Sequence, residues 1–507
     1  MNVTINQADF QYDIHSLVKA FYPEEDVTVR QGKTGIDYSG FEIYYSNDQI
    51  MKLAYYENGI IVHKITCDIK SAYLNQSIQT DAKERVLFKN QLKQQLYTLL
   101  KMTTKKELPW GTLTGIRPTK IALTMMEQGA SDEEIAESMR SVYFTTEEKI
   151  RLCCEIGRRE LNVLSRLHGH KGFSLYIGIP FCPTTCLYCS FTSYPIIKWK
   201  EQVDAYIDAL EKELALTAEF FHDRILDTVY IGGGTPTTLE PEQMLRLISL
   251  IKKYFDLEKG PIQEFTVEAG RPDSITKEKL QVLYDEGVTR ISINPQTMNE
   301  ETLKIIGRKH TVEQVKQAFA LARQTGFDNI NMDLILGLPG EAAKEGDDSK
   351  LRHTLDEIAA LQPEGLTIHS LAIKRAAGMH EWLLAHPEVK SINTPQMMTL
   401  VEEKARAQGL VPYYLYRQKN MTGNLENVGY AKPDKIGIYN ILIMEEKQTI
   451  AAVGAGTISK VVLKDGRIER CDNIKDIKLY LEKNDEILMK KRAFYTKYES
   501  DIKGTEE

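Results

Sequence analysis

The segment Tyr176-Ile-Gly-Ile-Pro-Phe-Cys182-Pro-Thr-Thr-Cys186-Leu-Tyr-Cys189-Ser-Phe191 decides the fold of this chain. Its first residues complete an apolar stretch, 173–179, that is typical of a buried β-strand. A loop with the spacing Cys-x3-Cys-x2-Cys follows. Thiolates suit iron–sulfur clusters. Such a loop can ligate three irons of a [4Fe–4S] cluster and leave the fourth open to an outside ligand. The spacing therefore predicts Cys182, Cys186 and Cys189 as cluster ligands.

Zinc binding and inert structural thiols are the other readings of these cysteines. Zinc usually takes four ligands, and no fourth cysteine lies nearby. His168 and His170 precede the strand, and His222 follows at the end of a predicted helix. The total of seven cysteines is odd, which argues against a disulfide framework. The remaining four cysteines fit buried free thiols: Cys67, Cys153, Cys154 and Cys471.

From Gly172 onward, short apolar strands alternate with amphipathic helices. The predicted strands cover 173–179, 228–232, 264–268, 290–294, 329–335 and 365–370. The predicted helices cover 200–221, 241–254, 276–286, 312–325 and 350–361. Repeated βα units imply a parallel sheet with right-handed crossovers. Six strands are too few for a closed eight-stranded barrel, so we expect an α/β fold with a partial (β/α)6 barrel and its chemistry at the C-terminal strand ends.

Two further sections flank this barrel, which we place at residues 166–380. Residues 1–165 are predicted to form an N-terminal α+β domain, and residues 381–507 a C-terminal α+β extension that covers the substrate. The N-terminal section has a long amphipathic helix near 81–102 and β-rich segments at 27–30, 40–45 and 60–67. Its role stays open between a lid, a docking surface for a redox partner and a stabilising unit.

The composition limits the class of protein. The chain has 507 residues, 42% hydrophobic and 27% charged, with a net charge of −7. It contains no run of about 18 apolar residues, so no membrane span is expected. The first ten residues lack the pattern of a signal peptide, which predicts a cytoplasmic location. The negative charge and the lack of a basic run disfavour nucleic-acid binding, and an anionic substrate would need local cations.

Several later segments fall where a ligand site needs them. Glycines in Gly232–Thr237, which end the second strand, allow backbone N–H groups to approach a ligand, although a tight turn explains them as well. Glu268 ends the third strand, where a carboxylate can face a ligand. Gln296, Arg308 and Asp333 follow or lie on later strands, and each fits a structural polar residue as well as a ligand contact.

The triad, with the aromatic Tyr188 inside its last gap, resembles the radical S-adenosylmethionine (SAM) superfamily. The resemblance implies that SAM fills the open iron through its amino and carboxylate groups. An electron from the cluster then cleaves SAM to methionine and a 5′-deoxyadenosyl radical, so that the cofactor carries the hard chemistry.

Residues from about 172 to 460 resemble the oxygen-independent coproporphyrinogen III oxidase (coproporphyrinogen dehydrogenase) family, in its long HemZ-like branch. The motifs are Tyr-x-x-x-Pro-Phe-Cys, Gly-Gly-Gly-Thr-Pro-Thr, Gln-Thr, Gly-Arg-x-His and Asp-Leu-Ile-x-Gly-Leu-Pro-Gly. The family holds two SAM molecules. Carried over by motif, the contacts to cluster-bound SAM are Tyr176, Gly233 and Glu268. The rest of the two SAM sites is lined by Tyr188, Gly234, Thr235, Gln296, Arg308, Asp333 and, as a looser match, Ala372.

The chain departs from the family pattern at two positions. The family usually has histidine two residues after the tyrosine of the first strand, and here that residue is Gly178. Some members have a fourth cysteine two residues after the triad, and here that residue is Phe191. Neither change removes a cluster ligand, but both bear on the substrate.

The resemblance implies a place in porphyrin and haem biosynthesis. The 5′-deoxyadenosyl radical would take a hydrogen atom from the propionate β-carbon of coproporphyrinogen III, and loss of CO2 and one electron would leave a vinyl group. Two rounds give protoporphyrinogen IX. The partners implied are the tetrapyrrole, an electron donor such as flavodoxin or ferredoxin, and an unknown electron acceptor.

The four carboxylates of this substrate need cations. The candidates are Lys374, Arg375, Arg417 and Lys419, for each of which a solvated basic patch is an equal alternative. Tyr413, Tyr414 and Tyr416 could line the flat macrocycle, or simply form a half-buried strand.

Two other functions stay open. Haem chaperones with this fold typically have a His-Asn-x-x-Tyr-Trp segment, whereas the segment at 426–431 reads Glu-Asn-Val-Gly-Tyr-Ala and lacks both the His and the Trp. The three tryptophans, Trp110, Trp199 and Trp382, lie elsewhere. A radical SAM methyltransferase acting on a tetrapyrrole shares the same motifs, and only its product would separate it from a decarboxylase.

Overall fold

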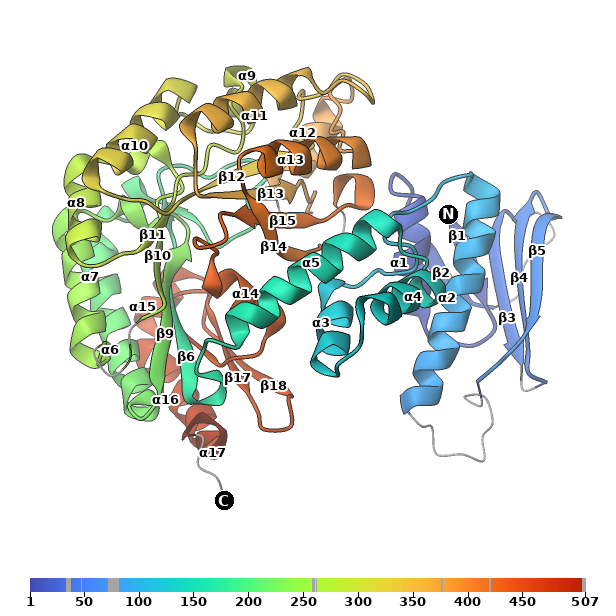
Figure 1. Ribbon diagram of the computed structural model, residues 1–507, viewed down its shortest axis with the longest axis horizontal. Coiled ribbons are helices and arrows are strands. Elements are labelled where there is room, and N and C mark those ends of the chain that lie inside the picture. The colour runs from blue at the N-terminus through green and yellow to red at the C-terminus, as the bar shows by residue number, and fades with distance from the viewer. Residues whose placement is uncertain are drawn as a thin grey trace. The chain divides into compact units, whose positions relative to one another are not determined.

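The computed structural model describes residues 1–32, 38–46, 48–71, 82–257, 260, 262–374, 377–418 and 421–503. It divides into two compact units, Met1–Gly157 and Arg158–Glu507. Each unit is described by itself below, with the element labels of Figure 1.

The first unit is built on a sheet with the strand order β2-β1-β3-β4-β5. The central strand β1 pairs in parallel with β2 and β3, and β3, β4 and β5 form an antiparallel meander. Apolar side chains of α1 and α2 are buried against the sheet. The strands are β1 (Asn2–Ile5), β2 (Thr28–Gln31), β3 (Gly40–Ser46), β4 (Ile50–Glu57) and β5 (Ile60–Asp68). The helices are α1 (Gln11–Phe21), α2 (Ala82–Thr104), α3 (Thr119–Glu127), α4 (Asp132–Tyr143) and α5 (Glu147–Leu164), the last of which contains the boundary.

The predicted N-terminal α+β fold is confirmed, with two strands and one helix that the sequence patterns missed. Strand β1 has four residues, too few for a visible alternation. Strand β4 was missed between its two predicted neighbours, and α1 was missed although Ile14, Leu17, Val18 and Phe21 form its buried face.

The second unit contains the expected barrel. Within the described residues, six parallel strands lie side by side in the order β6-β9-β10-β11-β12-β13. Their bounds are Gly172–Ile179, Ile225–Gly233, Glu264–Glu268, Arg290–Ser292, Ile330–Leu336 and Gly365–Ser370. Strand β6 is buried almost throughout, as expected for a strand covered on both faces. The prediction of an α/β fold with a partial (β/α)6 barrel is confirmed.

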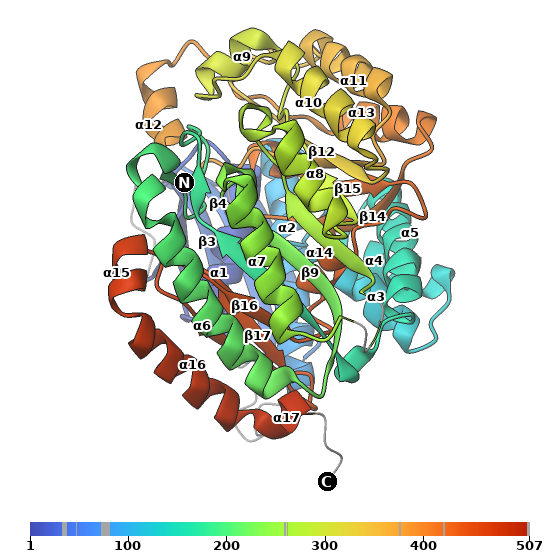
Figure 2. The same ribbon diagram turned by 90° about the vertical axis from the view of Figure 1, so that its left-hand side faces the viewer.

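Helices cover the outer face of these strands, and Figure 2 shows α6, α7 and α8 side by side over them. Local signals fix their ends. In α10, for example, the Thr311 side chain caps the first turn, and Gly326 adopts the left-handed conformation (φ 118°) after the last. The helices are α6 (Val203–Phe221), α7 (Pro241–Tyr254), α8 (Lys277–Asp285), α9 (Glu300–Ile305), α10 (Val312–Thr325) and α11 (Ser349–Leu361).

The C-terminal residues extend the same sheet at both edges. Beyond β13 lie the antiparallel strands β15 (Asn427–Ala431) and β14 (Val411–Tyr416). Beyond β6 lies β16 (Ile450–Val453), parallel to it, followed by β17 (Ile458–Val462) and β18 (Ile468–Asp472). The helices of this section are α12 (Gly378–Ala385), α13 (Pro395–Ala407), α14 (Ile438–Glu445), α15 (Ile477–Glu482), α16 (Asn484–Lys497) and α17 (Glu499–Lys503).

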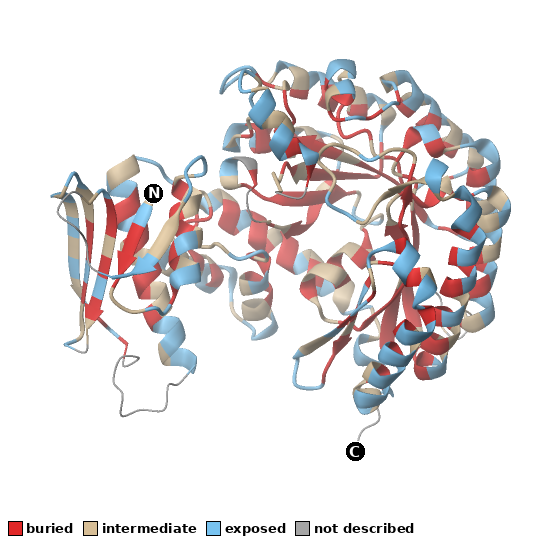
Figure 3. Cartoon of the chain, turned by 180° about the vertical axis from the view of Figure 1, so that it is seen from behind, coloured by how far each residue is buried: buried red, intermediate tan, exposed pale blue. Residues whose placement is uncertain are grey.

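A buried ionic network ties these C-terminal helices to α6. Glu213 accepts hydrogen bonds from Lys491, Tyr480, Asn473 (2.8 Å) and the backbone N–H of Gly454 (3.1 Å). Both charged side chains are at most 1% exposed. Figure 3 shows the barrel strands largely buried and the outward sides of the surrounding helices largely exposed. Over the described ranges, no helix is both long and apolar enough to span a membrane.

Candidate functional site

The cysteine loop leaves the C-terminal end of β6. Cys182 closes a short strand, β7 (Phe181–Cys182), that pairs with β8 (Tyr194–Pro195). Its Sγ accepts a hydrogen bond from the hydroxyl of Thr235 at 3.4 Å. Cys182 is buried, whereas Cys186 and Cys189 are partly exposed. The loop is thus anchored at one end and accessible at the other.

Burial raises the thiol pKa of Cys182 and Cys189, and the neighbouring thiols add to this rise. Metal binding would release the protons that such thiols carry. Among the described residues no three His, Cys, Asp or Glu side chains surround one point closely enough for a single metal ion. A [4Fe–4S] cluster does not need that geometry, because each thiolate binds a different iron. The donor set therefore fits a cluster better than a lone zinc ion.

Two buried arginines border the cysteine loop. Arg308 donates to the hydroxyl of Tyr188 (3.2 Å) and to the carbonyl oxygen of Gly270 (3.3 Å). Burial opposes its charge, but the Tyr188 hydroxyl and the Cys186 thiol hold the pKa of Arg308 above its ordinary value. Arg271 donates to Cys186 Sγ at 3.5 Å. Cations in this position favour the anionic thiolates that bind iron.

The glycine run at the end of β9 packs directly on the loop. The backbone N–H groups of Gly234 and Thr235 donate to the carbonyls of Ile179 (2.8 Å) and Phe181 (2.7 Å). A side-chain carbon on Gly234 would lie 2.6 Å from the Phe181 oxygen, so only glycine fits there. The run therefore fixes the position of Cys182, besides any contact that it makes to a ligand.

Glu268 lies at the end of β10 and is held by two donors. The Tyr230 hydroxyl donates to it at 2.6 Å and the backbone N–H of Gly233 at 3.3 Å. Burial raises the pKa of Glu268 to about 7, against the effect of the Tyr230 hydrogen bond. The rings of Tyr176, Tyr230 and Tyr439 of α14 stack on one another, with centroid distances of 6.0 Å from Tyr176 to Tyr230, 5.9 Å from Tyr176 to Tyr439 and 4.4 Å from Tyr230 to Tyr439. Aromatic rings thus line the interior beside a carboxyl group that titrates near neutrality.

Asp333 on β12 belongs to a second polar group. Its carboxylate lies 3.6 Å from His369 Nε2 on β13 and accepts from Asn331 at 2.7 Å. The other ring nitrogen of His369 lies 3.3 Å from the Tyr416 hydroxyl. Burial alone would raise the pKa of Asp333, but the interactions with His369 and Asn331 hold it below its ordinary value.

Gln296 adopts a left-handed backbone conformation (φ 69°), which is costly for a residue other than glycine and is often found at functional sites. Its N–H donates to the Asp333 carbonyl and its own carbonyl accepts from Ile335, both at 2.9 Å. Its side-chain oxygen and that of Asn294 are buried and make no hydrogen bond within the described residues. These two free acceptors, both just after the end of β11, fit a ligand with donor groups, as SAM has.

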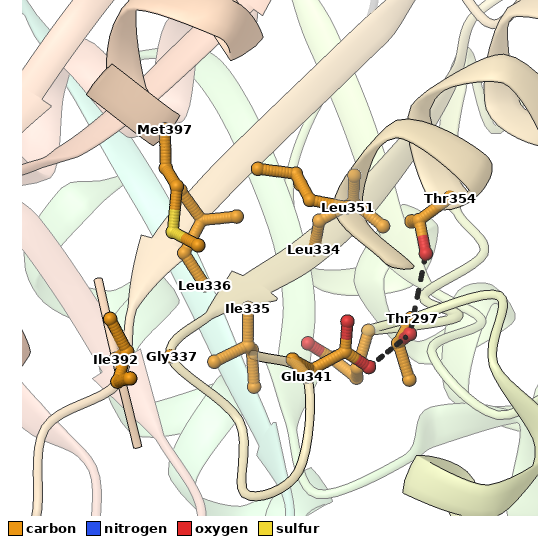
Figure 4. Close-up of a pocket in the computed structure, with 11 residues that line it drawn as sticks. Thr297, Leu334, Ile335, Leu336, Gly337, Glu341, Leu351, Thr354, Ile392 and Met397 are labelled. Atoms are coloured by element: carbon orange, nitrogen blue, oxygen red, sulfur yellow. Dashed lines mark hydrogen bonds between the residues drawn. The ribbon is translucent and has the colours of Figure 1, made fainter. Parts of the chain in front are cut away.

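A small pocket lies next to Gln296 (Figure 4). It is lined by β12 residues and by Leu351 and Thr354 of α11 and Met397 of α13. Thr297 donates to Glu341 at 2.9 Å across it. Since the helices contribute so much of its wall, this pocket belongs to the layer between sheet and helices.

The remaining predicted residues have mixed outcomes. Ala372 forms an isolated bridge with Met421, beyond the end of β13. Arg417 is buried and donates to Asn424 (2.8 Å), while Lys374 donates to Ser190 (2.9 Å). Arg375 and Lys419 lie outside the described residues. Tyr413 and Tyr414 are buried in β14, whereas Tyr416 reaches His369.

Direct contacts thus join Cys182 to Thr235, Tyr188 to Arg308 and Gly233 to Glu268. The SAM roles of these residues, and of the others carried over by motif, stay predictions. Sequence reasoning missed Arg271, Tyr230, His369 and Tyr439. Tyr230 and His369 lie on predicted strands, and Arg271 follows Glu268 by three residues. No motif or spacing marks Tyr439.

Comparisons with known proteins identify the family to which this chain is similar. A model of the radical SAM superfamily matches residues 176–350. The chain is 45% identical over 404 residues to the oxygen-independent coproporphyrinogen-III oxidase-like protein HemZ of Bacillus subtilis, covering 78% of each. It is 39% identical over 201 residues to the heme chaperone HemW of the same organism, covering 40% of this chain and 51% of HemW. The solved coproporphyrinogen III oxidase HemN from Escherichia coli is 24% identical with a TM-score of 0.48, covering 64% of this chain and 72% of that one.

Fold, cysteine loop and superfamily match define a radical SAM protein, and this family implies a [4Fe–4S] cluster and SAM. More narrowly, the chain belongs to the radical SAM coproporphyrinogen oxidase family, in its HemZ-like branch. The family predicted from the motifs is confirmed.

Proposed function

We propose that the protein catalyses the oxygen-independent decarboxylation of two propionates of coproporphyrinogen III to vinyl groups, giving protoporphyrinogen IX. The observation that carries the proposal is that Glu268 at the end of β10 lies within electrostatic reach of the Asp333–His369 pair of β12 and β13, inside the barrel whose first strand leads into the cysteine loop. The identity to HemZ over most of both chains supports it. The proposal includes two SAM molecules, an electron donor such as flavodoxin or ferredoxin, a separate one-electron acceptor for the electron that each substrate radical releases, and a cytoplasmic location.

The residues of the chain have separable tasks in this reaction. Cys182, Cys186 and Cys189 would hold the cluster, which together with SAM would supply the radical chemistry for hydrogen-atom removal. Glu268, fixed by Tyr230 and Gly233, would accept a hydrogen bond from the amino group of SAM when it is ionised.

His369 is proposed to act in this interior by orienting its two neighbours, because both of its ring nitrogens are already engaged. Asp333 on one side and Tyr416 on the other fix its ring. The stacked tyrosines Tyr176, Tyr230 and Tyr439 form an apolar wall that limits the access of water to a radical.

Anaerobic turnover tests the proposal. Reconstituted protein with coproporphyrinogen III, SAM and dithionite is expected to form protoporphyrinogen IX and 5′-deoxyadenosine. A Cys186→Ala variant should form neither, and Cys471→Ala, which changes a buried cysteine outside the triad, should behave as the wild type.

Three results would contradict decarboxylation. SAM cleavage without a decarboxylated product would make the substrate wrong. Stoichiometric haem binding without turnover would indicate a chaperone, and a methylated product with S-adenosylhomocysteine would indicate a methyltransferase. In the 426–431 segment, which lacks the His and Trp of the chaperone motif, Asn427 is buried and accepts from the backbone N–H of Ser370 at 2.8 Å.

A further inference from the structure

Arg271 is a buried cation beside the cysteine loop that no motif assigns. It follows Glu268 by three residues, at the end of β10, and is only 3% exposed. A guanidinium group is seldom buried so deeply unless its donors are satisfied. Its partners therefore indicate what it does.

One side of the guanidinium is fixed by Asp273. Nε and Nη2 of Arg271 donate to the two carboxylate oxygens at 3.1 and 3.0 Å, the forked arrangement that holds the plane of an arginine. The Asp273 side chain is 21% exposed and the Arg271 side chain 4%. Solvent therefore screens the charge of Asp273 more than that of Arg271.

The opposite side of the guanidinium faces the cysteine loop. Nη1 donates to the carbonyl of Thr184 at 3.2 Å and to Cys186 Sγ at 3.5 Å, and Nη2 donates to the Thr184 hydroxyl at 3.0 Å. One side chain thus holds both the backbone between Cys182 and Cys186 and a predicted cluster sulfur.

We propose that Arg271 is a positioning residue that raises the reduction potential of the cluster through its N–H···S bond to Cys186. Reduction by an external low-potential donor adds one electron and therefore one negative charge. A positive donor on a ligating sulfur stabilises that added charge, because hydrogen bonds to cluster sulfurs are a recognised determinant of potential. The inference rests on the cluster assignment within the proposed function and is independent of the substrate.

The test measures the cluster without substrate. Wild type, Arg271→Gln and Arg352→Gln are reconstituted anaerobically, and iron content and midpoint potential are measured by an EPR-monitored titration without SAM. Arg352 lies on α11 and pairs with Asp348, so its variant controls for the loss of a charge elsewhere. Arg271→Gln is expected to lower the equilibrium constant for reduction about tenfold, a shift of about 59 mV to more negative potential for one electron. Arg352→Gln should not change it.

A second variant separates electrostatics from simple loosening of the loop. Asp273→Asn removes the negative charge behind Arg271 and keeps an acceptor for it, so the potential should become less negative. A role confined to loop structure would shift both variants in the same direction, which would overturn the proposal. An unchanged potential in Arg271→Gln with full iron content would overturn it as well.

If Arg271→Gln fails to hold iron, Asp273→Asn alone decides the proposal by the sign of its shift. Failure of coproporphyrinogen turnover in the wild type would contradict the proposed function and leave these potentials unaffected.

Discussion

Glu268 is the residue through which pH should act on the site. Burial raises its pKa from 4.5 to about 7, so the carboxyl group is neutral below pH 7 and ionised above it. The folded state holds this proton more tightly than the unfolded state does. Protonation of Glu268 therefore stabilises the fold at low pH, and this contribution to the free energy of unfolding is lost as the pH rises from 4.5 through 7.

If Glu268 must be ionised to accept a hydrogen bond from the amino group of SAM, binding should weaken as the pH falls below 7, about tenfold per unit. The SAM dissociation constant of reconstituted protein, measured by equilibrium dialysis across this range, checks the prediction. Glu268→Gln should bind weakly with a flat profile. A wild-type profile that is also flat would remove Glu268 from the site.

Glu160 on α5 is a second buried carboxyl group, outside the site. It is fully buried, and neither of its oxygens has a hydrogen-bond partner in the described part of the chain. Burial and the nearby Glu445 raise its pKa well above 4.5. Glu160 therefore lowers the free energy of unfolding progressively as the pH rises above 4.5.

Glu160→Gln should raise the free energy of unfolding at pH 8 by ~1–3 kcal/mol, since it removes a buried group that ionises more readily in the unfolded chain than in the folded one. Thermal unfolding of the full chain near pH 8 and near pH 5 checks this, and the gain should shrink at the lower pH. Glu313→Gln, on the exposed side of α10, is the matched control and should have little effect at either pH. A larger gain at pH 5 would contradict the pKa shift.

At the level of single residues, the sequence could locate strand-end groups but not their partners. Glu268 was predicted as a candidate because it ends an apolar run, and the triad because of its spacing. Arg271 and His369 contact Cys186 and Asp333, from which they are separated by many residues. Such contacts depend on strand order, which local patterns do not show.

Among the elements, α16 is joined to the barrel by a buried ion pair. Lys491 pairs with Glu213 of α6 and donates to the Ala452 carbonyl of β16 at 2.7 Å. Breaking a buried pair by removing one partner leaves the other charge without compensation, which costs about 3–5 kcal/mol.

Lys491→Met should therefore lower the free energy of unfolding by about 3–5 kcal/mol, measured by chemical denaturation. Adding Glu213→Gln to it should recover part of the loss, because the orphaned charge is then gone. Additive losses in the double variant would mean that packing, not charge, stabilises this contact. Lys490→Met, at the exposed neighbouring position, should be close to neutral.

The barrel was the part of the fold that local patterns could predict. Along the barrel sequence, each short apolar strand is followed by an amphipathic helix. The ends predicted for α7 and α10 are the observed ends. Strand β16 was not predicted, because Ile450–Val453 is short and apolar and pairs with β6, which lies far away in the sequence. Its four residues fit several kinds of structure equally well.

For the whole molecule, the first unit has a hydrophobic core of its own. Phe21, Phe41, Tyr45, Phe88 and Leu96 are fully buried within it. A region with its own core is expected to fold alone.

A fragment of residues 1–164, which ends with α5, should therefore unfold cooperatively, as measured by circular dichroism during thermal denaturation. A gradual, non-cooperative change would contradict an independent unit. The same fragment could then be tested for binding of flavodoxin or ferredoxin, one of the roles left open by its sequence.

The pairing of β16 with β6 places the end of the chain beside the start of the barrel. On the ribosome, the edge of β6 stays uncovered until the residues after the barrel have emerged. At ~5–20 residues per second this wait is on the order of ten seconds or more. An open strand edge is a template for wrong pairing, so this interval is when the nascent chain most needs a chaperone. Since β6 leads into the cysteine loop, iron and sulfide are best delivered to the finished polypeptide, after translation has ended.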